Sequence, residues 1–203
     1  MDGIDVSRFQ GTIDWAAVKA TGSVDFVIAK ATEGLSLVDD QFARNLSVCK
    51  ERGIPIGAYH FFHPHSDPKA QADHFLSVVD VDDLDILPAV DVELSDNVAQ
   101  AGIVQALSTF IQAIEKKTNG KRMLLYTFYS FWNDTMHGSD AFSGHPLWLA
   151  EYNQDPSPTL PLGFSNYAIW QYSKTGNIDG IAGDVDLNRL SSDSLLDIGT
   201  LRR

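Results

Sequence analysis

The sequence predicts a single α/β barrel whose eight strands are joined by helices in the first part of the chain and by loops in the last part. Short apolar segments alternate with helical segments up to residue 127. Three more strand-like segments follow, separated by stretches rich in Pro, Gly, Ser and Asn. The 203 residues, 44% of them hydrophobic, are enough for one substantial core. Strands that alternate with helices favour right-handed units in a parallel sheet, and eight strands favour closure into a barrel.

The predicted strands are short apolar runs bounded by turn-forming residues. They span residues 3–7, 26–31, 54–61, 87–93, 122–127, 146–151, 168–172 and 185–187. An open doubly wound sheet is the alternative arrangement. Such a sheet normally carries a Gly-rich phosphate loop after its first strand, and Ser7-Arg8-Phe9-Gln10-Gly11 is not one.

Four helices are predicted between the first five strands from apolar residues at helical spacing. The first helix is expected to start at Asp14 and stop at Gly22, and the second to stop at Gly53. The third is expected to start at Asp67-Pro68, and the fourth to stop at Gly120. The second helix is expected to carry Val38, Phe42, Leu46 and Cys49 on one face. No amphipathic pattern follows residue 127, so we expect loops between the last strands.

Composition excludes several classes of function. The formal charge of −12 is opposite to the charge that binds phosphate backbones or anionic surfaces, so we expect no nucleic-acid partner. No apolar run approaches the roughly 18 residues of a membrane span, so we expect no membrane insertion. The single cysteine, Cys49, rules out an internal disulfide and is expected to pack in the core.

Acidic and aromatic residues recur where the predicted strands end. These residues are Asp5, Lys30, Glu33, Tyr59, Phe61, Asp91, Glu93, Tyr126, Trp148, Gln171 and Asp186. Asp91 and Glu93 share one face of their strand because side chains alternate along it. Active sites of parallel barrels lie at the carboxyl ends of the strands. Paired carboxylates among aromatic rings are typical of a carbohydrate site, since glycosidic bonds are cleaved by Asp and Glu pairs and sugars stack on rings.

Six motifs carry a resemblance to a known family. They are Asp5-Val6-Ser7, Lys30-Ala31-Thr32-Glu33-Gly34, Gly57-Ala58-Tyr59-His60-Phe61, Pro88-Ala89-Val90-Asp91-Val92-Glu93, Trp170-Gln171-Tyr172 and Val185-Asp186-Leu187-Asn188. Their order and spacing resemble those of the glycoside hydrolase family 25 lysozymes, from residue 2 to about residue 190. The resemblance implies a (β/α)5(β)3 TIM-like barrel. It also implies hydrolysis of the β-1,4 bond between N-acetylmuramic acid and N-acetylglucosamine in bacterial peptidoglycan.

The resemblance assigns catalytic roles to four acids. Glu93 is expected to be the general acid, with a pKa raised by Asp91 and the other acids. Asp91 is expected to act as the nucleophile or to orient the acetamido group of the substrate. Sequence spacing does not distinguish these roles, and we favour substrate assistance because the substrate carries that group. Asp5 and Asp186 are expected to tune the pair and to hold sugar hydroxyls or water. The neighbouring Asp184 has no assigned role.

Further side chains are expected to contact the substrate. They are Lys30, Glu33, Tyr59, Phe61, Tyr126, Trp148, Tyr152 and Gln171. Lys30 is expected either to pair with the acids or to form a structural ion pair. Trp132, Trp170 and Phe128 are expected to pack in the core. His60 should point away from the site, and His63-Pro64-His65 lacks a supporting metal motif, so we expect no metal and no cofactor.

Three other functions remain open from the sequence. A chitinase-like hydrolase also uses D-x-E, but residues 84–93 lack the fuller D-x-x-D-x-D-x-E run. A non-catalytic wall-binding module and a metal-dependent phosphodiesterase on the same barrel are the others. We expect one monomeric catalytic domain over residues 1–203, without a separate wall-binding domain. The printed chain shows no signal peptide, so we expect a secreted mature form or a phage-type lysin that acts on the wall from outside the cell.

Overall fold

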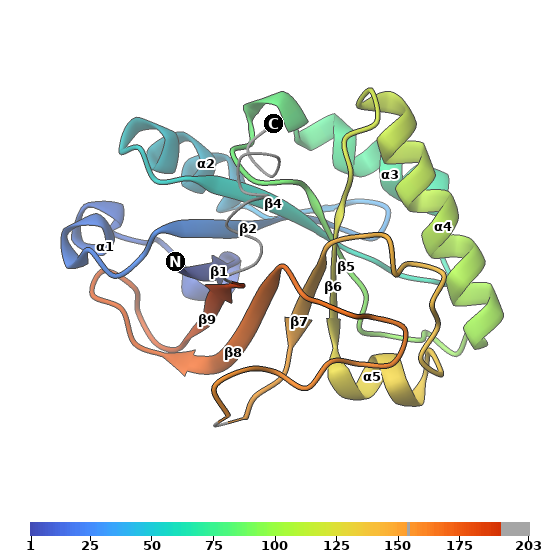
Figure 1. Cartoon of the computed structure of the whole chain (residues 1–203). Helices are drawn as coiled ribbons and strands as arrows, with labels where there is room; N and C mark the ends of the chain where they lie inside the picture. Colours follow the sequence, from blue (N-terminus) through green and yellow to red (C-terminus); the bar gives the residue numbers. More distant parts are fainter. Residues whose placement is uncertain (154, 192–203) are drawn as a thin grey trace.

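A closed barrel of eight strands forms the centre of the computed structural model, which describes residues 1–153 and 155–191 (Figure 1). The barrel strands are β1 (Asp2–Val6), β2 (Phe26–Glu33), β4 (Ile56–Phe61), β5 (Ala89–Asp91), β6 (Leu124–Phe128), β7 (Leu147–Ala150), β8 (Ile169–Gly176) and β9 (Val185–Leu190). Their order is β1-β9-β8-β7-β6-β5-β4-β2, and pairing of β1 with β2 closes the ring. The predicted α/β barrel is confirmed, while the end of the predicted domain at residue 203 lies outside the described residues.

The last strand runs against the direction expected for a fully parallel sheet. All neighbouring pairs from β1 through β2 and β4 to β8 are parallel, but β9 is antiparallel to both β8 and β1. Only residues 177–184 connect β8 with β9. A parallel crossover needs about a dozen residues or more, whereas a short connection returns the chain antiparallel. Asp186 therefore enters the barrel mouth from the beginning of β9, not from its carboxyl end.

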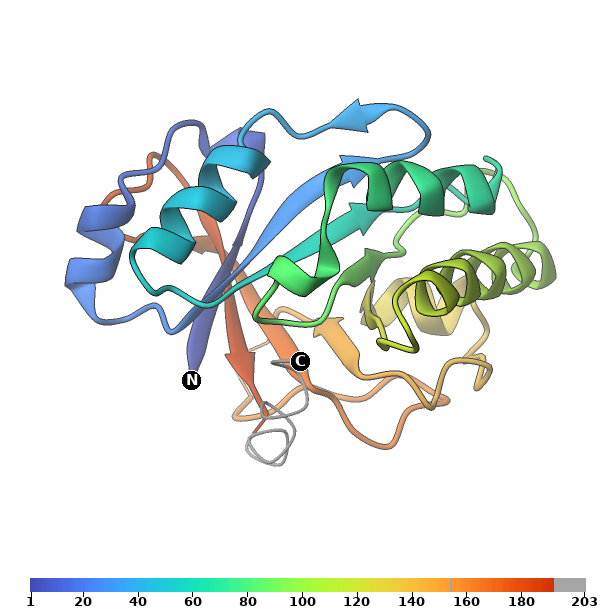
Figure 2. The ribbon, with the colours of Figure 1, turned by 90° about the horizontal axis from the view of Figure 1, so that it is seen from above.

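Within the described residues, five helices cover the outside of the barrel. They are α1 (Trp15–Thr21), α2 (Phe42–Glu51), α3 (Pro68–Val78), α4 (Gln100–Lys117) and α5 (Tyr129–Asp134). Single turns of 3-10 helix precede α1, as η1 (Arg8–Gln10), and lie between α3 and α4, as η2 (Val81–Asp83). The predicted caps form: Asp14 accepts hydrogen bonds from the amides of Ala16 and Ala17, and Asp67 accepts from those of Lys69 and Ala70. In Figure 2 the blue and green helices line one side of the barrel, and loops cover the orange side of β7 and β8.

Two local predictions were wrong. Val38 lies in a short strand, β3 (Leu37–Val38), which forms a hairpin with β2, so α2 begins later than expected. The helix α5 occupies a region where loops were expected. Its six residues are too few for a helical period to show in the sequence, but Trp132 anchors it in the core.

Side chains on the two faces of the strands build separate cores. The outer core, between helices and barrel, includes Cys49, which is a buried free thiol as expected. The inner core fills the barrel with Phe26, Ile28, Leu87, Ala89, Leu124, Tyr126, Trp148, Ala150, Ala168 and Ile169. Because this filling ends at Tyr126 and Trp148, it forms the floor of an open mouth above. No helix in the described part of the chain is long and apolar enough to cross a membrane.

Candidate active site

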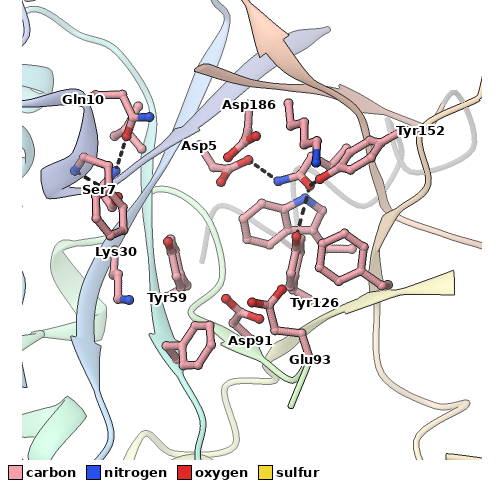
Figure 3. Close-up of a pocket in the computed structure, with 17 residues that line it drawn as sticks. Asp5, Ser7, Gln10, Lys30, Tyr59, Asp91, Glu93, Tyr126, Tyr152 and Asp186 are labelled. Carbon is pink, nitrogen blue, oxygen red and sulfur yellow. Dashed lines mark hydrogen bonds between the residues drawn. The ribbon is translucent and has the colours of Figure 1, made fainter. Parts of the chain in front are cut away.

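A cavity of about 310 Å³ opens at the mouth of the barrel above this floor (Figure 3). Every site residue predicted from the sequence lines it except Glu33. Figure 3 shows two pairs of acids that face each other across the space, Asp5 with Asp186 and Asp91 with Glu93. The barrel mouth therefore brings Asp5 and Asp186, more than 180 positions apart in the sequence, into one pocket.

The pair Asp91 and Glu93 is held by the backbone between them. Asp91 ends β5, and its carbonyl accepts a hydrogen bond from the amide of Phe62 at 3.0 Å. The amide of Val92 donates to Tyr126 O at 3.0 Å, and Thr127 Oγ1 donates to Val92 O at 2.8 Å. The chain thus stays extended past the end of β5, which keeps both carboxyl groups on the cavity side.

The pair Asp5 and Asp186 lies on adjacent antiparallel strands in direct register. Asp5 is buried, and its Oδ2 accepts hydrogen bonds from Gln171 Nε2 at 2.8 Å and Asn188 Nδ2 at 2.7 Å. Gln171 Oε1 in turn accepts from the hydroxyls of Tyr126 at 3.0 Å and Tyr152 at 2.7 Å. The amide of Gln171 therefore positions Asp5 and also lines the cavity.

Burial raises the pKa of all four acids. Burial and then repulsion by Asp186 raise the pKa of Asp5 to about 8. Burial and then repulsion by Glu93 raise the pKa of Asp91 well above its usual range. Burial also raises the pKa values of Glu93 and Asp186, against the opposing charges of Lys30 and Lys174 respectively.

Asp91 and Glu93 therefore both hold a proton more tightly than a free carboxyl group does, and repulsion by Glu93 adds to this effect at Asp91. We expected Asp91 and the other acids to raise the pKa of Glu93; burial is the larger cause, and Asp186 is the acid that adds to it. When one of two neighbouring carboxyl groups stays protonated, it can donate its proton to a bond held between them. The other, ionised group can then act as a polar or nucleophilic partner.

Lys30 supplies positive charge without a direct bond to Asp91 or Glu93. Its Nζ contacts Glu33 Oε2 at 2.6 Å and lies 4.7 Å from the centre of the Phe61 ring. The charge of Lys30 nevertheless opposes the rise in the pKa of Asp91 and of Glu93. Lys30 thus forms a structural ion pair and also acts on the two acids through its charge. Glu33 holds Lys30 from outside the cavity lining.

Aromatic rings form a continuous wall on one side of the cavity. Successive ring centres are 6.2 Å apart from Tyr59 to Trp148, 4.7 Å from Trp148 to Tyr126, 5.9 Å from Tyr126 to Phe128 and 6.0 Å from Phe128 to Tyr152. Trp148 is only 1% exposed and Tyr152 is 40% exposed. Trp148 therefore belongs to the floor, while Tyr152 offers a face at the rim.

The structure adds lining residues that the sequence argument missed. Phe128, expected to be core, lines the cavity together with Ser7, Phe9, Gln10 and Lys174. Ser7 and Gln10 form a capping box at η1, which holds Phe9 at the rim with 80% of its surface exposed. A short S-x-x-Q pattern after a strand end was the available signal. Trp132 and Trp170 are buried outside the cavity lining, as expected.

Histidines lie beside the site rather than in it. His60 is buried on the outer face of β4, where its ring bonds Thr32 Oγ1 at 2.7 Å and Gln71 Oε1 at 3.2 Å. His63 and His65 share Asp96 as a partner, and a ligand atom from each of the three lies within 4.8 Å of the others. We expected no metal at His63 and His65 because the sequence around them has no supporting metal motif; Asp96, which lies on another loop, is outside that pattern.

Comparison with known proteins agrees with this geometry. A model of the family described as "Glycosyl hydrolases family 25" matches residues 4–181. Lysozyme M1 of Streptomyces globisporus is 37% identical over 203 residues, which covers 94% of this chain and 68% of that protein. The autolytic lysozyme of Clostridium acetobutylicum is 33% identical over 97% of this chain and 57% of its own length. The crystal structure of the bacterial lysozyme from Streptomyces coelicolor matches with a TM-score of 0.86 and 32% identity, covering 98% of this chain and 96% of that one.

Proposed function

The chain belongs to glycosyl hydrolases family 25 and is a peptidoglycan hydrolase of the lysozyme type, and on that basis we propose a role for each acid in the barrel mouth. The bond cleaved is the β-1,4 linkage between N-acetylmuramic acid and N-acetylglucosamine. Glu93 is the general acid, Asp91 orients the acetamido group of the substrate, and Asp5 with Asp186 completes the polar side of the cavity.

The observation that carries the role of Asp91 is a buried oxygen without a partner. Asp91 is 6% exposed, and among the described residues no group hydrogen-bonds its buried Oδ1. A buried acceptor left unpaired is costly, so a donor from a bound substrate would be strongly favoured there. The acetamido N–H of N-acetylmuramic acid is such a donor.

Binding of that N–H also determines which acid keeps the proton of the pair. A hydrogen bond to the ionised form of Asp91 lowers its pKa, and the shared proton then resides on Glu93. Glu93 delivers this proton to the glycosidic oxygen as the bond to the anomeric carbon breaks. The acetamido oxygen attacks the same carbon, and a water molecule later opens the resulting ring, so the anomeric configuration is retained overall. Direct attack by Asp91 is the competing route.

The remaining residues hold the sugar chain and shield the reaction. Asp5 and Asp186 offer acceptor oxygens to sugar hydroxyls or to the attacking water. Tyr152 and Phe61 offer ring faces at the rim, which suit the apolar faces of sugars. The partner is bacterial peptidoglycan, and we propose that the protein meets it outside the cell as a monomer. The net charge of −12 favours a search for the wall through such specific contacts rather than through charge.

The bond assignment is tested by mass spectrometry of the sugars released from purified peptidoglycan. Fragments with N-acetylmuramic acid at the reducing end support the proposal. Reducing-end N-acetylglucosamine would show a different bond, as would release of chitin oligosaccharides from chitin at a comparable rate. An Asp184→Asn variant should release the same fragments as the wild type, because Asp184 is exposed beside the site and does not line the cavity.

A further inference from the structure

Two loops at the mouth of the barrel bring His63, His65 and Asp96 together outside the catalytic cavity. The histidines follow β4 and the aspartate follows β5, and these two strands pair in parallel, so their loops leave the barrel at the same end. Asp96 Oδ2 lies 3.0 Å from His63 Nδ1 and 2.9 Å from His65 Nδ1. One carboxylate oxygen therefore faces the same nitrogen of both rings.

The opposite nitrogens of both rings already have partners. His63 Nε2 lies 3.2 Å from Glu33 Oε1, and His65 Nε2 lies 3.3 Å from Ser66 Oγ. Glu33 can accept a hydrogen bond from Nε2 of His63, and Nδ1, on the side of Asp96, is then the ring nitrogen that an ion would bind. An outer carboxylate that holds one imidazole nitrogen while the other binds an ion is the usual support of a metal-ligating histidine.

We propose that His63, His65 and Asp96 bind a divalent transition-metal ion, with Zn²⁺ as the expected occupant. Ligands about 2.0–2.1 Å from a tetrahedral zinc are separated by about 3.3 Å. The two nitrogen–oxygen separations of 3.0 and 2.9 Å are within a few tenths of an ångström of that value. Imidazole ligands favour Zn²⁺, Ni²⁺ and Cu²⁺ over Ca²⁺ and Mg²⁺.

The surroundings allow an ion to enter without rearrangement of the barrel. The side chain of His65 is 58% exposed, so its ring can adjust and water can complete the coordination. Asp96 adopts φ 49°, a left-handed conformation that Asp and Asn tolerate better than other residues with a side chain. Substitution by Asn therefore changes the ligand and preserves the backbone.

The proposed cation site is separate from the catalytic cavity, because His63, His65 and Asp96 do not line that cavity. Glu33 bonds His63 through Oε1 and Lys30 through Oε2. The ion would bind Nδ1 of His63 and leave the contact between Nε2 of His63 and Glu33 in place. Binding of the ion therefore does not depend on the proposed roles of Glu93 and Asp91, and a failure of either proposal leaves the other standing.

Isothermal titration of the full chain with Zn²⁺ tests this site, with protein that carries no polyhistidine tag and has been dialysed against a chelator. The wild type should bind one Zn²⁺, and a Co²⁺ complex should show the visible absorption of nitrogen and oxygen ligation. His65→Ala and Asp96→Asn should weaken binding by well over tenfold. Glu33→Gln should weaken it by about 10–100-fold, as expected for an outer-shell partner.

His137→Asn is the matched control, because His137 is an exposed histidine whose φ of 51° Asn also tolerates. Its Zn²⁺ affinity should equal that of the wild type. Absence of saturable Zn²⁺ binding to the wild type would overturn the proposal. So would wild-type affinity in His65→Ala and Asp96→Asn proteins whose thermal unfolding shows that they are folded.

Discussion

Replacement of Asp5 by Asn should stabilise the protein at neutral pH while it impairs the enzyme. Asp5 accepts two hydrogen bonds on the same oxygen, from Gln171 and Asn188, and faces Asp186 across the strand pair. Asn keeps an oxygen that can accept both bonds, and its amide can donate toward Asp186. The substitution therefore removes an ionisable group from a buried position and leaves the network intact.

The magnitude follows from the pKa. Burial and the charge of Asp186 raise the pKa of Asp5 from 3.8 to about 8, so between these values the folded state holds a proton that the unfolded state releases. Stability is then unaffected below pH 3.8 and falls as the pH rises toward about 8. At pH 7 roughly three pKa units separate the pH from the unfolded value, which corresponds to about 4 kcal/mol. Coupling to Asp186 reduces this, and we expect a gain of about 2–4 kcal/mol for Asp5→Asn at pH 7.

Thermal unfolding followed by circular dichroism from pH 4 to pH 8 measures this gain. The Tm of Asp5→Asn should exceed that of the wild type by on the order of 5–10 °C at pH 7, and the difference should vanish near pH 4. The exposed Asp184→Asn should show no such trend. A Tm difference that is independent of pH, or a loss of stability at pH 7, would refute the reasoning.

Three other substitutions test separate parts of the account. Lys30→Met removes the charge that opposes the rise in pKa of Asp91 and Glu93, so the pH profile of kcat/KM should move to higher pH, and an unchanged profile would contradict this. Phe110→Ala empties a buried position beside His60 and Phe62 and should cost about 3–5 kcal/mol in chemical denaturation, with kcat unchanged while the protein is folded. Tyr152→Ala should raise KM by up to about tenfold, whereas Tyr152→Phe keeps the ring face, loses only the hydroxyl that bonds Gln171 Oε1, and should raise KM less; equal effects would exclude stacking.

Much of the fold was predictable because its signals are local. Apolar runs mark all eight barrel strands, and Asp14 and Asp67 mark helix starts through bonds to amides two and three residues away. The direction of β9 was not predictable from composition, since Val185 and Leu187 suit either direction. It depends on the length of the connection that precedes the strand.

Residues of the candidate site that lie at the ends of strands could be predicted from the sequence. Residues that reach the barrel mouth from loops could not. Asp91 and Glu93 could be paired because the strand period is two. Asp96 could not be paired with His63, because their contact is fixed by two loop conformations more than 30 residues apart. Lys174 lines the cavity because β8 continues beyond its predicted end at residue 172.

The most direct test of the catalytic account compares Glu93→Gln with the wild type on two substrates that differ in leaving group. One is peptidoglycan, and the other is a 2,4-dinitrophenyl glycoside of the disaccharide N-acetylglucosaminyl-N-acetylmuramic acid, whose leaving group needs no proton. If Glu93 is the general acid, the variant should lose about 10²–10⁴-fold in kcat on peptidoglycan and far less on the activated glycoside. Equal losses on both substrates, or full activity on peptidoglycan, would show that the proton comes from another group.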